Sequence, residues 1–205
     1  MKRILIITAS ILVSITAMAG RSDSVPCKRF TFGAEWNYIA SFSSIIHHNF
    51  FSEIGYRVDI KDRMFEYKSN ADLYLHCGLN MNENWNVSLY AGIAGVYDIN
   101  KVVPISLRFT RYFRPDEKGD RWFAFLDGGS GISLSRHPQS IACGKAGGGF
   151  RLAMNQVSML DFIVAFRMTL THPELEFDGF SIPADKINRN NALVSAVSVG
   201  LSLTF

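Results

Sequence analysis

Residues 195–205, SAVSVGLSLTF, alternate strictly between two kinds of side chain. Val197, Val199, Leu201, Leu203 and Phe205 are apolar, whereas the residues between them are small or polar. A repeat of two residues is the period of a β-strand, whose successive side chains point to opposite faces. The segment is therefore predicted to be a strand with one apolar face and one small, polar face.

Seven further segments show the same alternation, which gives eight predicted strands. In one of them, Phe162, Val164 and Phe166 alternate with Asp161 and Arg167 on the other face. Each segment reaches the length of about 9–11 residues that a tilted β-strand needs to cross a membrane. The eight predicted strands are residues 28–41, 70–81, 85–97, 102–113, 121–134, 142–154, 158–171 and 195–205.

The connections between these strands differ in length. Three polar connections are short and three others are longer, and a further one, at 98–101, is also short. Long connections at one end and short turns at the other, with an even strand count, predict an all-β fold: an eight-stranded antiparallel up-and-down transmembrane β-barrel with both termini in the periplasm. The three short polar connections are 82–84, 114–120 and 155–157, and the three longer ones are 42–69, 135–141 and 172–189.

The N-terminal residues have the pattern of an export signal. Lys2 and Arg3 precede an uncharged, mostly apolar run that ends in Ala17-Met18-Ala19. Such a run is too short to span a membrane and ends in a small-x-small cleavage site. Residues 1–19 are predicted to be a signal peptide read by the Sec machinery, and residues 20–205 the barrel domain, located in the bacterial outer membrane.

Charge and composition exclude several classes of protein. The chain has 21 basic and 18 acidic residues, so loss of Lys2 and Arg3 leaves 19 against 18. Such a balance argues against a nucleic-acid partner, which favours a basic stripe. No later stretch has 18 consecutive apolar residues, so a helical span is not expected. Cys27, Cys77 and Cys143 match no metal motif and are interpreted as incidental.

Alternation alone does not separate a membrane barrel from a soluble barrel with an apolar interior. The other face of the strands distinguishes the two kinds of barrel. It carries four acids and four bases, together with small residues that leave room for them. Opposite charges can neutralise one another in a narrow lumen, where an unpaired buried charge would be costly. We therefore predict a lumen plugged by paired charges. This predicted lumen charge network consists of Glu35, Asp72, Asp127, Asp161, Arg108, Lys145, Arg151 and Arg167.

The eight-strand pattern and the ending from Val197 to Phe205 resemble the small eight-stranded outer-membrane proteins, such as the barrel of the outer-membrane protein A family and the X-type proteins. The resemblance implies a monomer surrounded by outer-membrane lipids. It also implies that Phe205 belongs to the signal read by the barrel-assembly machinery. No periplasmic peptidoglycan-binding domain follows the predicted barrel, so the tethering role of the first family is not expected here.

Catalytic and metal-binding patterns are weak. An outer-membrane lipid A deacylase of this shape uses a His-x-Ser pair, whereas here His137 and Ser140 are separated by a proline and a glutamine. The adjacent His47 and His48 do not have a ligand spacing. We expect no enzyme activity, cofactor or metal. A lipid A-modifying enzyme, a small-solute channel and a soluble periplasmic ligand-binding barrel stay open as alternatives.

Two of the long connections are unusually apolar for solvent-exposed loops. Residues 45–56 read IIHHNFFSEIGY, and residues 175–182 are similar in character. Such loops either fold onto the barrel rim as a cap or bind a partner. An extension of the first two predicted strands beyond the membrane, which would also use residues 53–67, is a further alternative. An extracellular ligand at residues 42–69 and 172–189 is therefore one hypothesis. Overall, the sequence predicts a structural or surface-interaction role.

Overall fold

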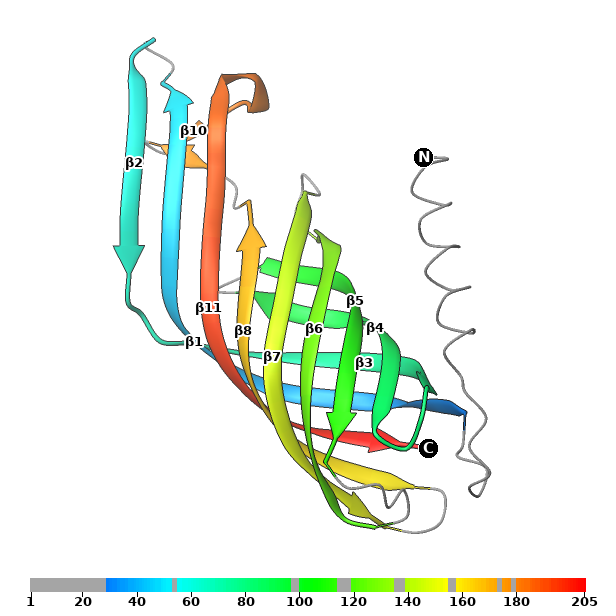
Figure 1. Ribbon diagram of the computed structural model, residues 1–205. Coiled ribbons are helices and arrows are strands. Elements are labelled where there is room, and N and C mark those ends of the chain that lie inside the picture. The colour runs from blue at the N-terminus through cyan, green and yellow to red at the C-terminus, as the bar shows by residue number, and fades with distance from the viewer. Residues whose placement is uncertain are drawn as a thin grey trace, which may run out of the picture.

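Eight long antiparallel strands of the computed structural model form a closed barrel (Figure 1). The eight strands are β1 (Phe30–Phe51), β3 (Lys68–Asn80), β4 (Trp85–Val96), β5 (Asn100–Tyr112), β6 (Arg121–Ser133), β7 (Ser140–Ala153), β8 (Met159–Thr171) and β11 (Ile187–Thr204). The structure describes residues 29–52, 55–96, 100–113, 119–134, 139–154, 158–172, 175–177 and 180–205. The predicted signal peptide at residues 1–19 lies outside this range.

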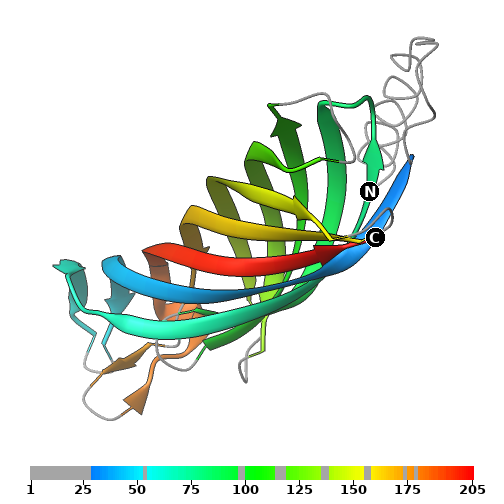
Figure 2. The same ribbon diagram turned by 90° about the horizontal axis from the view of Figure 1, so that it is seen from below.

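The barrel closes where the first strand meets the last. β1 pairs with β3 on one side and with β11 on the other, and each remaining strand pairs with its neighbour in the chain order. Figure 2 shows β11, in red, between β1 and β8. At one rim, Gly33 pairs with Thr204, and the backbones of Phe32 and Phe205 exchange two hydrogen bonds of 3.1 and 2.8 Å. We call this end the terminal rim. The predicted fold is confirmed.

The outer surface of the wall is apolar. Leu75, Leu126 and Trp122 expose 68%, 66% and 64% of their surface, although all three lie within regular strands. Large aliphatic and aromatic side chains are similarly exposed around the wall, while the eight residues of the lumen charge network, on the same strands, are buried. This arrangement is the reverse of a soluble barrel, and it suits a surface that contacts lipid. Within the described ranges, no helix is long and apolar enough to span a membrane.

The interior is not polar along its whole length. Near the rim opposite the terminal rim, side chains from β4, β5, β7 and β11 form a buried apolar cluster. A second cluster, from β5, β6 and β8, contains aromatic residues. The polar character predicted for the inner face therefore holds only for part of the barrel. The first cluster is Ala94, Val96, Val102, Ile141 and Val194, and the second is Tyr112, Phe123, Phe125, Ile163 and Ala165.

The first and last strands are longer than predicted. The first was expected to end at residue 41 and the last to begin at 195, but β1 continues to Phe51 and β11 begins at Ile187. The connection 42–69 contains a further strand, β2 (Arg57–Met64), which pairs with β1 from Ser44↔Met64 to Phe51↔Arg57. Alternation alone predicts a loop here, because residues 45–51, IIHHNFF, place similar side chains on both faces and the period of two is hidden.

We call the resulting three-stranded sheet the extension: β2, residues 44–51 of β1 and residues 187–193 of β11. It continues the wall beyond the other strands, at what we call the extension rim (Figure 1). A bulge lies at its base, where the register of β1 against β11 shifts between Ser41 and Ser43 and leaves Phe42 as the additional residue. β1 also changes partner here, since its pairing with β3 ends at Ser41↔Lys68.

The connection 172–189 is also partly regular. It contains a short hairpin of β9 (Glu176–Phe177) and β10 (Phe180–Ser181), followed by a 3-10 turn, η1 (Ala184–Lys186). Figures 1 and 2 both show this hairpin beside the extension. Ile182, which follows the hairpin, exposes only 7% of its surface. The side chain of Ile182 is therefore packed among neighbouring residues.

Candidate functional site: the lumen charge network and the extension

The structure places all eight residues of the lumen charge network inside the barrel. Each exposes 7% or less of its surface. They come from six strands, so the network is assembled by barrel closure and not by local sequence. The acids are Glu35 of β1, Asp72 of β3, Asp127 of β6 and Asp161 of β8, and the bases are Arg108 of β5, Lys145 and Arg151 of β7, and Arg167 of β8.

Arg108 is the centre of the network. Its Nη1 and Nη2 donate to the two carboxylate oxygens of Glu35 at 2.5 and 3.1 Å, and its Nε donates to Asp127 Oδ2 at 3.1 Å. The guanidinium lies between the rings of Tyr90 and Phe125, 3.9 and 4.2 Å from their centroids. The planar guanidinium of arginine can make forked hydrogen bonds to a carboxylate and stack on aromatic faces at the same time, which a lysine ammonium cannot. The two carboxylates and the two rings around position 108 therefore suit an arginine side chain.

A second part of the network is built around Asp72. Arg167 Nη1 donates to Asp72 Oδ2 at 2.6 Å. Asn37 links this pair to the Arg108 group, because its amide nitrogen donates to Asp72 at 2.6 Å and to Glu35 at 2.8 Å. Lys145 is held more loosely, with Nζ at 3.7 Å from Asp72 and 3.9 Å from Glu35. Six of the eight predicted residues thus form one connected group.

Arg151 and Asp161 form a separate pair nearer the terminal rim. Arg151 donates through Nε and Nη2 to the two oxygens of Asp161, both at 2.6 Å. The two residues face each other in the register of neighbouring strands β7 and β8. The guanidinium of Arg151 also lies 4.7 Å from the ring centroid of Tyr112. Among the described residues, the four acids of the network are thus paired with three arginines.

Sequence reasoning missed several interior residues that complete these groups. Asn37 bridges two carboxylates, Tyr90 and Phe125 sandwich Arg108, and Tyr112 lies between two arginines. Arg121 is a fifth buried base, 3.7 Å from the ring centroid of Tyr112, and it donates to the Glu83 carbonyl at 3.1 Å. The sequence does indicate the position of Arg121, because it is an even number of residues from Asp127 on β6 and so lies on the same, inward face.

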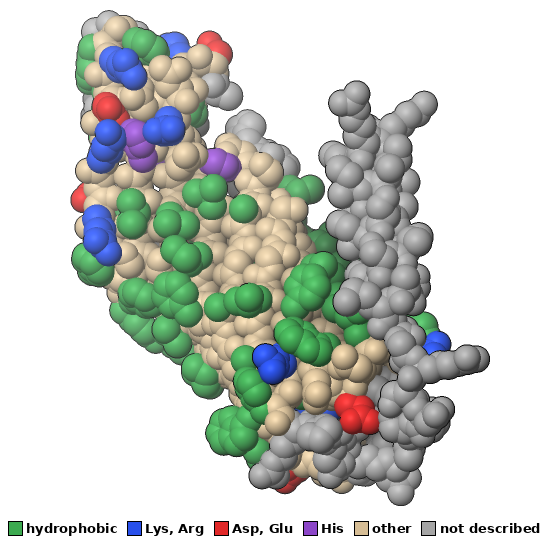
Figure 3. Space-filling model, in the orientation of Figure 1, with side chains coloured by type: hydrophobic (Ala, Val, Ile, Leu, Met, Phe, Trp, Pro, Cys, Tyr) green, Lys and Arg blue, Asp and Glu red, His purple; other side chains and the backbone are tan. Residues whose placement is uncertain are grey.

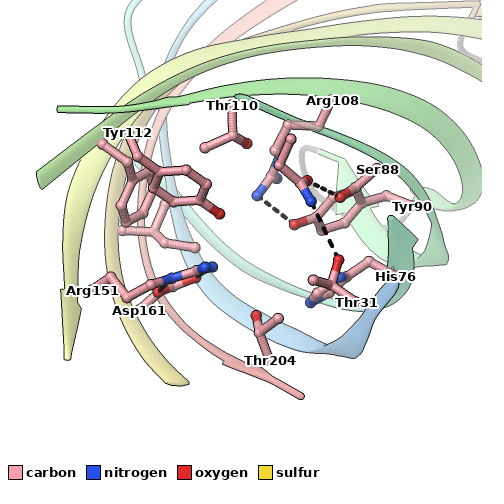
Figure 4. Close-up of a pocket in the computed structure, with 13 residues that line it drawn as sticks. Thr31, His76, Ser88, Tyr90, Arg108, Thr110, Tyr112, Arg151, Asp161 and Thr204 are labelled. Carbon is pink, nitrogen blue, oxygen red and sulfur yellow. Dashed lines mark hydrogen bonds and ion pairs between the residues drawn. The ribbon is translucent and has the colours of Figure 1, made fainter. Parts of the chain in front are cut away.

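A small cavity of about 20 Å³ lies between Arg108 and Arg151 (Figure 4). Figure 4 shows polar groups from several strands around it, among them Thr31, His76 and Thr204. Such a volume holds roughly one or two water molecules. The cavity is therefore suited to water that hydrates the network and is too small for an organic ligand.

The structure brings one histidine and one serine together inside the barrel. His76 Nε2 lies 3.3 Å from Ser202 Oγ, while Nδ1 of the same ring has no hydrogen-bond partner among the described residues. A catalytic base of this kind needs a third group to orient it. His137 lies outside the described residues, and Ser140 begins β7. In the described part of the chain, His, Cys, Asp and Glu form no group of three that could hold a metal ion.

The extension carries its own polar contacts. His47 Nε2 lies 3.0 Å from Asp59 Oδ1, and Arg189 Nη1 approaches the other nitrogen of the same ring at 3.4 Å. Arg57 donates from Nε to the Asn49 side-chain oxygen at 3.1 Å. Strand pairing places these residues on the outward face, which continues the outer surface of the barrel wall.

His48 lies on the opposite, inward face of the extension. In the register it pairs with Ile60 of β2 and Asn190 of β11. Burial and the neighbouring His47 lower the pKa of His48 below its usual 6.5, although a hydrogen bond with Asn190 acts in the other direction. The surroundings of His48 on the inward face therefore favour its neutral imidazole over the charged form.

Phe205 lies at the terminal rim, where it completes the closure of the barrel. Its ring stacks on Phe32 with a centroid separation of 5.5 Å. Cys77 is exposed on the outer wall and Cys143 is buried inside, both as free thiols, while Cys27 lies outside the described residues.

Small outer-membrane barrels are among the solved structures that this chain matches. Neisserial surface protein A matches with a TM-score of 0.51 and 12% identity, over 86% of this chain and 97% of that protein. The outer membrane protein OprG from Pseudomonas aeruginosa matches with a TM-score of 0.50 and 12% identity, over 86% of this chain and 95% of that protein. No protein-family model and no curated protein sequence matches. The chain has the fold of the small eight-stranded outer-membrane barrels.

Proposed function

We propose that this chain is a monomeric integral protein of the bacterial outer membrane, exported by its Sec signal peptide. The barrel serves as a plugged anchor, and the extension is displayed at the cell surface to contact a partner. The proposal assigns no catalytic step to the chain. The outer-membrane lipids surround the wall, and both termini face the periplasm.

The outer surface supports the membrane location. Apolar side chains exposed on every side of a closed wall would be unfavourable in water, whereas a lipid bilayer solvates them. Strand closure leaves the barrel without a free edge, so the backbone groups of the wall are satisfied internally. Phe205, stacked on Phe32, lies where the terminal strand completes this closure, in agreement with its proposed role as an assembly signal.

The lumen charge network is the observation that carries the plugged-anchor proposal. Arg108 of β5 reaches Glu35 of β1, and Arg167 of β8 reaches Asp72 of β3, so ion pairs connect strands that are not neighbours in the wall. Eight strands enclose an interior that side chains can fill. The same interior also contains the two apolar clusters. Together these groups leave little room for a continuous aqueous path.

Membrane fractionation and planar bilayers test the proposal. The protein is expected in the detergent-soluble outer-membrane fraction, with different gel mobility before and after boiling. Purified wild-type protein in a planar bilayer is expected to show no steady, porin-sized conductance. Release by osmotic shock would contradict the membrane location, and a stable large conductance would contradict the plugged lumen.

A small-solute channel is the second candidate. The cavity of about 20 Å³ and the loosely held Lys145 favour it, because both mark a weaker part of the lumen packing. In the bilayer experiment this candidate predicts small, steady currents from the wild-type protein. Substitution Lys145→Ala would then enlarge those currents, whereas in a plugged barrel it would leave them absent.

A further inference from the structure

The outward face of the extension is rich in basic side chains. Strand pairing places His47, Arg57, Lys61, Arg63 and Arg189 on this face, which we call the basic face. The four Arg and Lys side chains are exposed. Among the described positions of the same face, Asp59 is the single acid, so the excess is three positive charges with the histidine neutral.

These charges lie directly beyond the apolar surface of the wall. Figure 3 shows basic side chains, histidine and some acidic side chains at the upper end of the molecule, above a band of hydrophobic side chains. Ile45 and Leu193 pair with each other at the base of the basic face and continue that band into the extension. Because the band is the part that contacts lipid, the basic face begins at the level of the lipid headgroups. This placement rests on the proposed function.

The basic face is not neutralised within the protein. Asp59 is engaged by His47 at 3.0 Å, and Arg57 donates to the neutral Asn49. In the described part of the chain, Lys61, Arg63 and Arg189 have no carboxylate within 4.0 Å, in contrast to the arginines of the lumen. Exposed cations that have no carboxylate partner within the protein can bind an external anion.

Aromatic side chains accompany the basic ones. The guanidinium of Arg63 lies 4.8 Å from the ring centroid of Phe65, which exposes 70% of its surface. Tyr67 follows, and its hydroxyl is hydrogen-bonded to that of Tyr38 on the outer wall. Exposed aromatic rings next to arginine and lysine are typical of the boundary between the hydrocarbon core and the headgroups. This pairing favours a lipid over a soluble anion.

We propose that the basic face binds the phosphate groups of outer-leaflet lipid headgroups. Arginine binds phosphate through forked hydrogen bonds, and lysine binds it as a point charge. Lys61 and Arg63 are two residues apart on one strand, which separates them by about 7 Å along it. Arg189, on β11, widens the face in the direction across the sheet. The extension then rests its outward side on the headgroup layer.

The test uses the full-length barrel in lipid nanodiscs and measures hydrogen exchange of the amides in residues 57–64. One set of discs contains phosphatidylcholine alone. The others contain phosphatidylcholine with bisphosphorylated lipid A, or with the same lipid A after removal of its phosphates. With the phosphorylated lipid, exchange is expected to slow by about threefold or more. The dephosphorylated lipid is expected to have no such effect.

Two variants test whether the protection depends on the basic face or on any exposed positive charge. The triple substitution Lys61→Gln, Arg63→Gln, Arg189→Gln is expected to lose the protection. Arg29→Gln with Arg111→Gln is the matched control, because both bases are exposed near the terminal rim, and it is expected to keep it. A triple variant that is protected like the wild type, in discs where it inserts normally, overturns the proposal and leaves the proposed function intact.

Further arms identify the source of the anion. Inorganic phosphate at the same concentration, or a soluble sulfated polysaccharide, is expected to give no protection in phosphatidylcholine discs. Equal protection by either one overturns the assignment to a lipid headgroup. Boiled and unboiled gel mobility reports insertion independently. Failure of the wild type to insert overturns the proposed function, and this inference with it.

Discussion

The barrel interior and the basic face of the extension use the same kinds of side chain in opposite ways. In the interior, arginines are paired with carboxylates at 2.5–3.1 Å and are withdrawn from solvent. On the basic face, Lys61, Arg63 and Arg189 are exposed and have no acidic partner among the described residues. Buried charges must be balanced inside the protein, whereas exposed charges can be left for a ligand. The comparison separates charges that hold the fold from charges that are available for recognition.

The largest expected effect comes from removing a buried arginine. Arg108→Ala leaves Glu35 and Asp127 without their principal partner, so the free energy of unfolding should fall by about 3–5 kcal/mol. Urea unfolding of the protein in liposomes measures this value. Arg111→Ala is the matched control on the same strand, since Arg111 is exposed, and its cost should be about 0.5 kcal/mol or less. An equal loss of unfolding free energy at the two positions would contradict the distinction between buried and exposed charges.

A smaller effect is expected at the outer wall. Val164, which exposes 56% of its surface near the middle of β8, should contact lipid, so Val164→Arg should cost about 2–4 kcal/mol. The next residue, Ala165, faces the interior, and Ala165→Ser should cost much less. Unfolding in liposomes again provides the measurement. Small and equal effects would contradict the assignment of the outer surface to lipid.

Neutralising the basic face should leave the barrel almost unchanged. Lys61→Gln and Arg63→Gln remove exposed charges that have no carboxylate partner among the described residues, so the free energy of unfolding should change by about 0.5 kcal/mol or less in phosphatidylcholine. The same unfolding assay that detects Arg108→Ala checks this expectation. A large loss of stability would show that these bases hold the extension together, and the contrast with the interior would then disappear.

The smallest expected effect depends on pH and on the inward face of the extension. Because the pKa of His48 is lowered in the folded protein, folding favours its neutral form. The stabilising contribution is complete above the unfolded value of 6.5 and is lost as pH falls below it through the folded value. Hydrogen exchange in residues 57–64, corrected for intrinsic rates, should rise more on acidification in the wild type than in His48→Gln. The same acid response in both would exclude His48 as its source.

The fold was predictable because one physical rule governs most of the wall. Each strand alternates between lipid and lumen, so the period of two identifies the strands and assigns their faces, as in β8 and the end of β11. The same rule gave the membership of the lumen charge network, since every residue on the charged face must point inward. Its pairing was beyond the sequence, because Arg108 and Glu35 are 73 positions apart and meet only when the barrel closes.

The extension was not predictable from alternation. Its residues 45–51, IIHHNFF, place similar side chains on both faces of the strand, so the period of two does not appear in the sequence. The basic face is likewise invisible in the sequence, since Arg189 is more than a hundred positions from β2 and joins it through β1. Pairing of distant strands, not local pattern, creates this surface.

The bulge at Phe42 has a consequence for how far the extension can reach. Up to Ser41, before the bulge, β1 pairs with β3, and from Ser44 onward it pairs with β2. The bulge therefore separates the part of β1 in the barrel wall from the part in the extension. Adding two residues to each of the three strands above it would keep every side chain on its present face and raise the tip by about 7 Å. Adding one residue would exchange the faces. The length of the extension above the bulge can therefore change in steps of two residues per strand, while the membrane-embedded wall below the bulge stays the same.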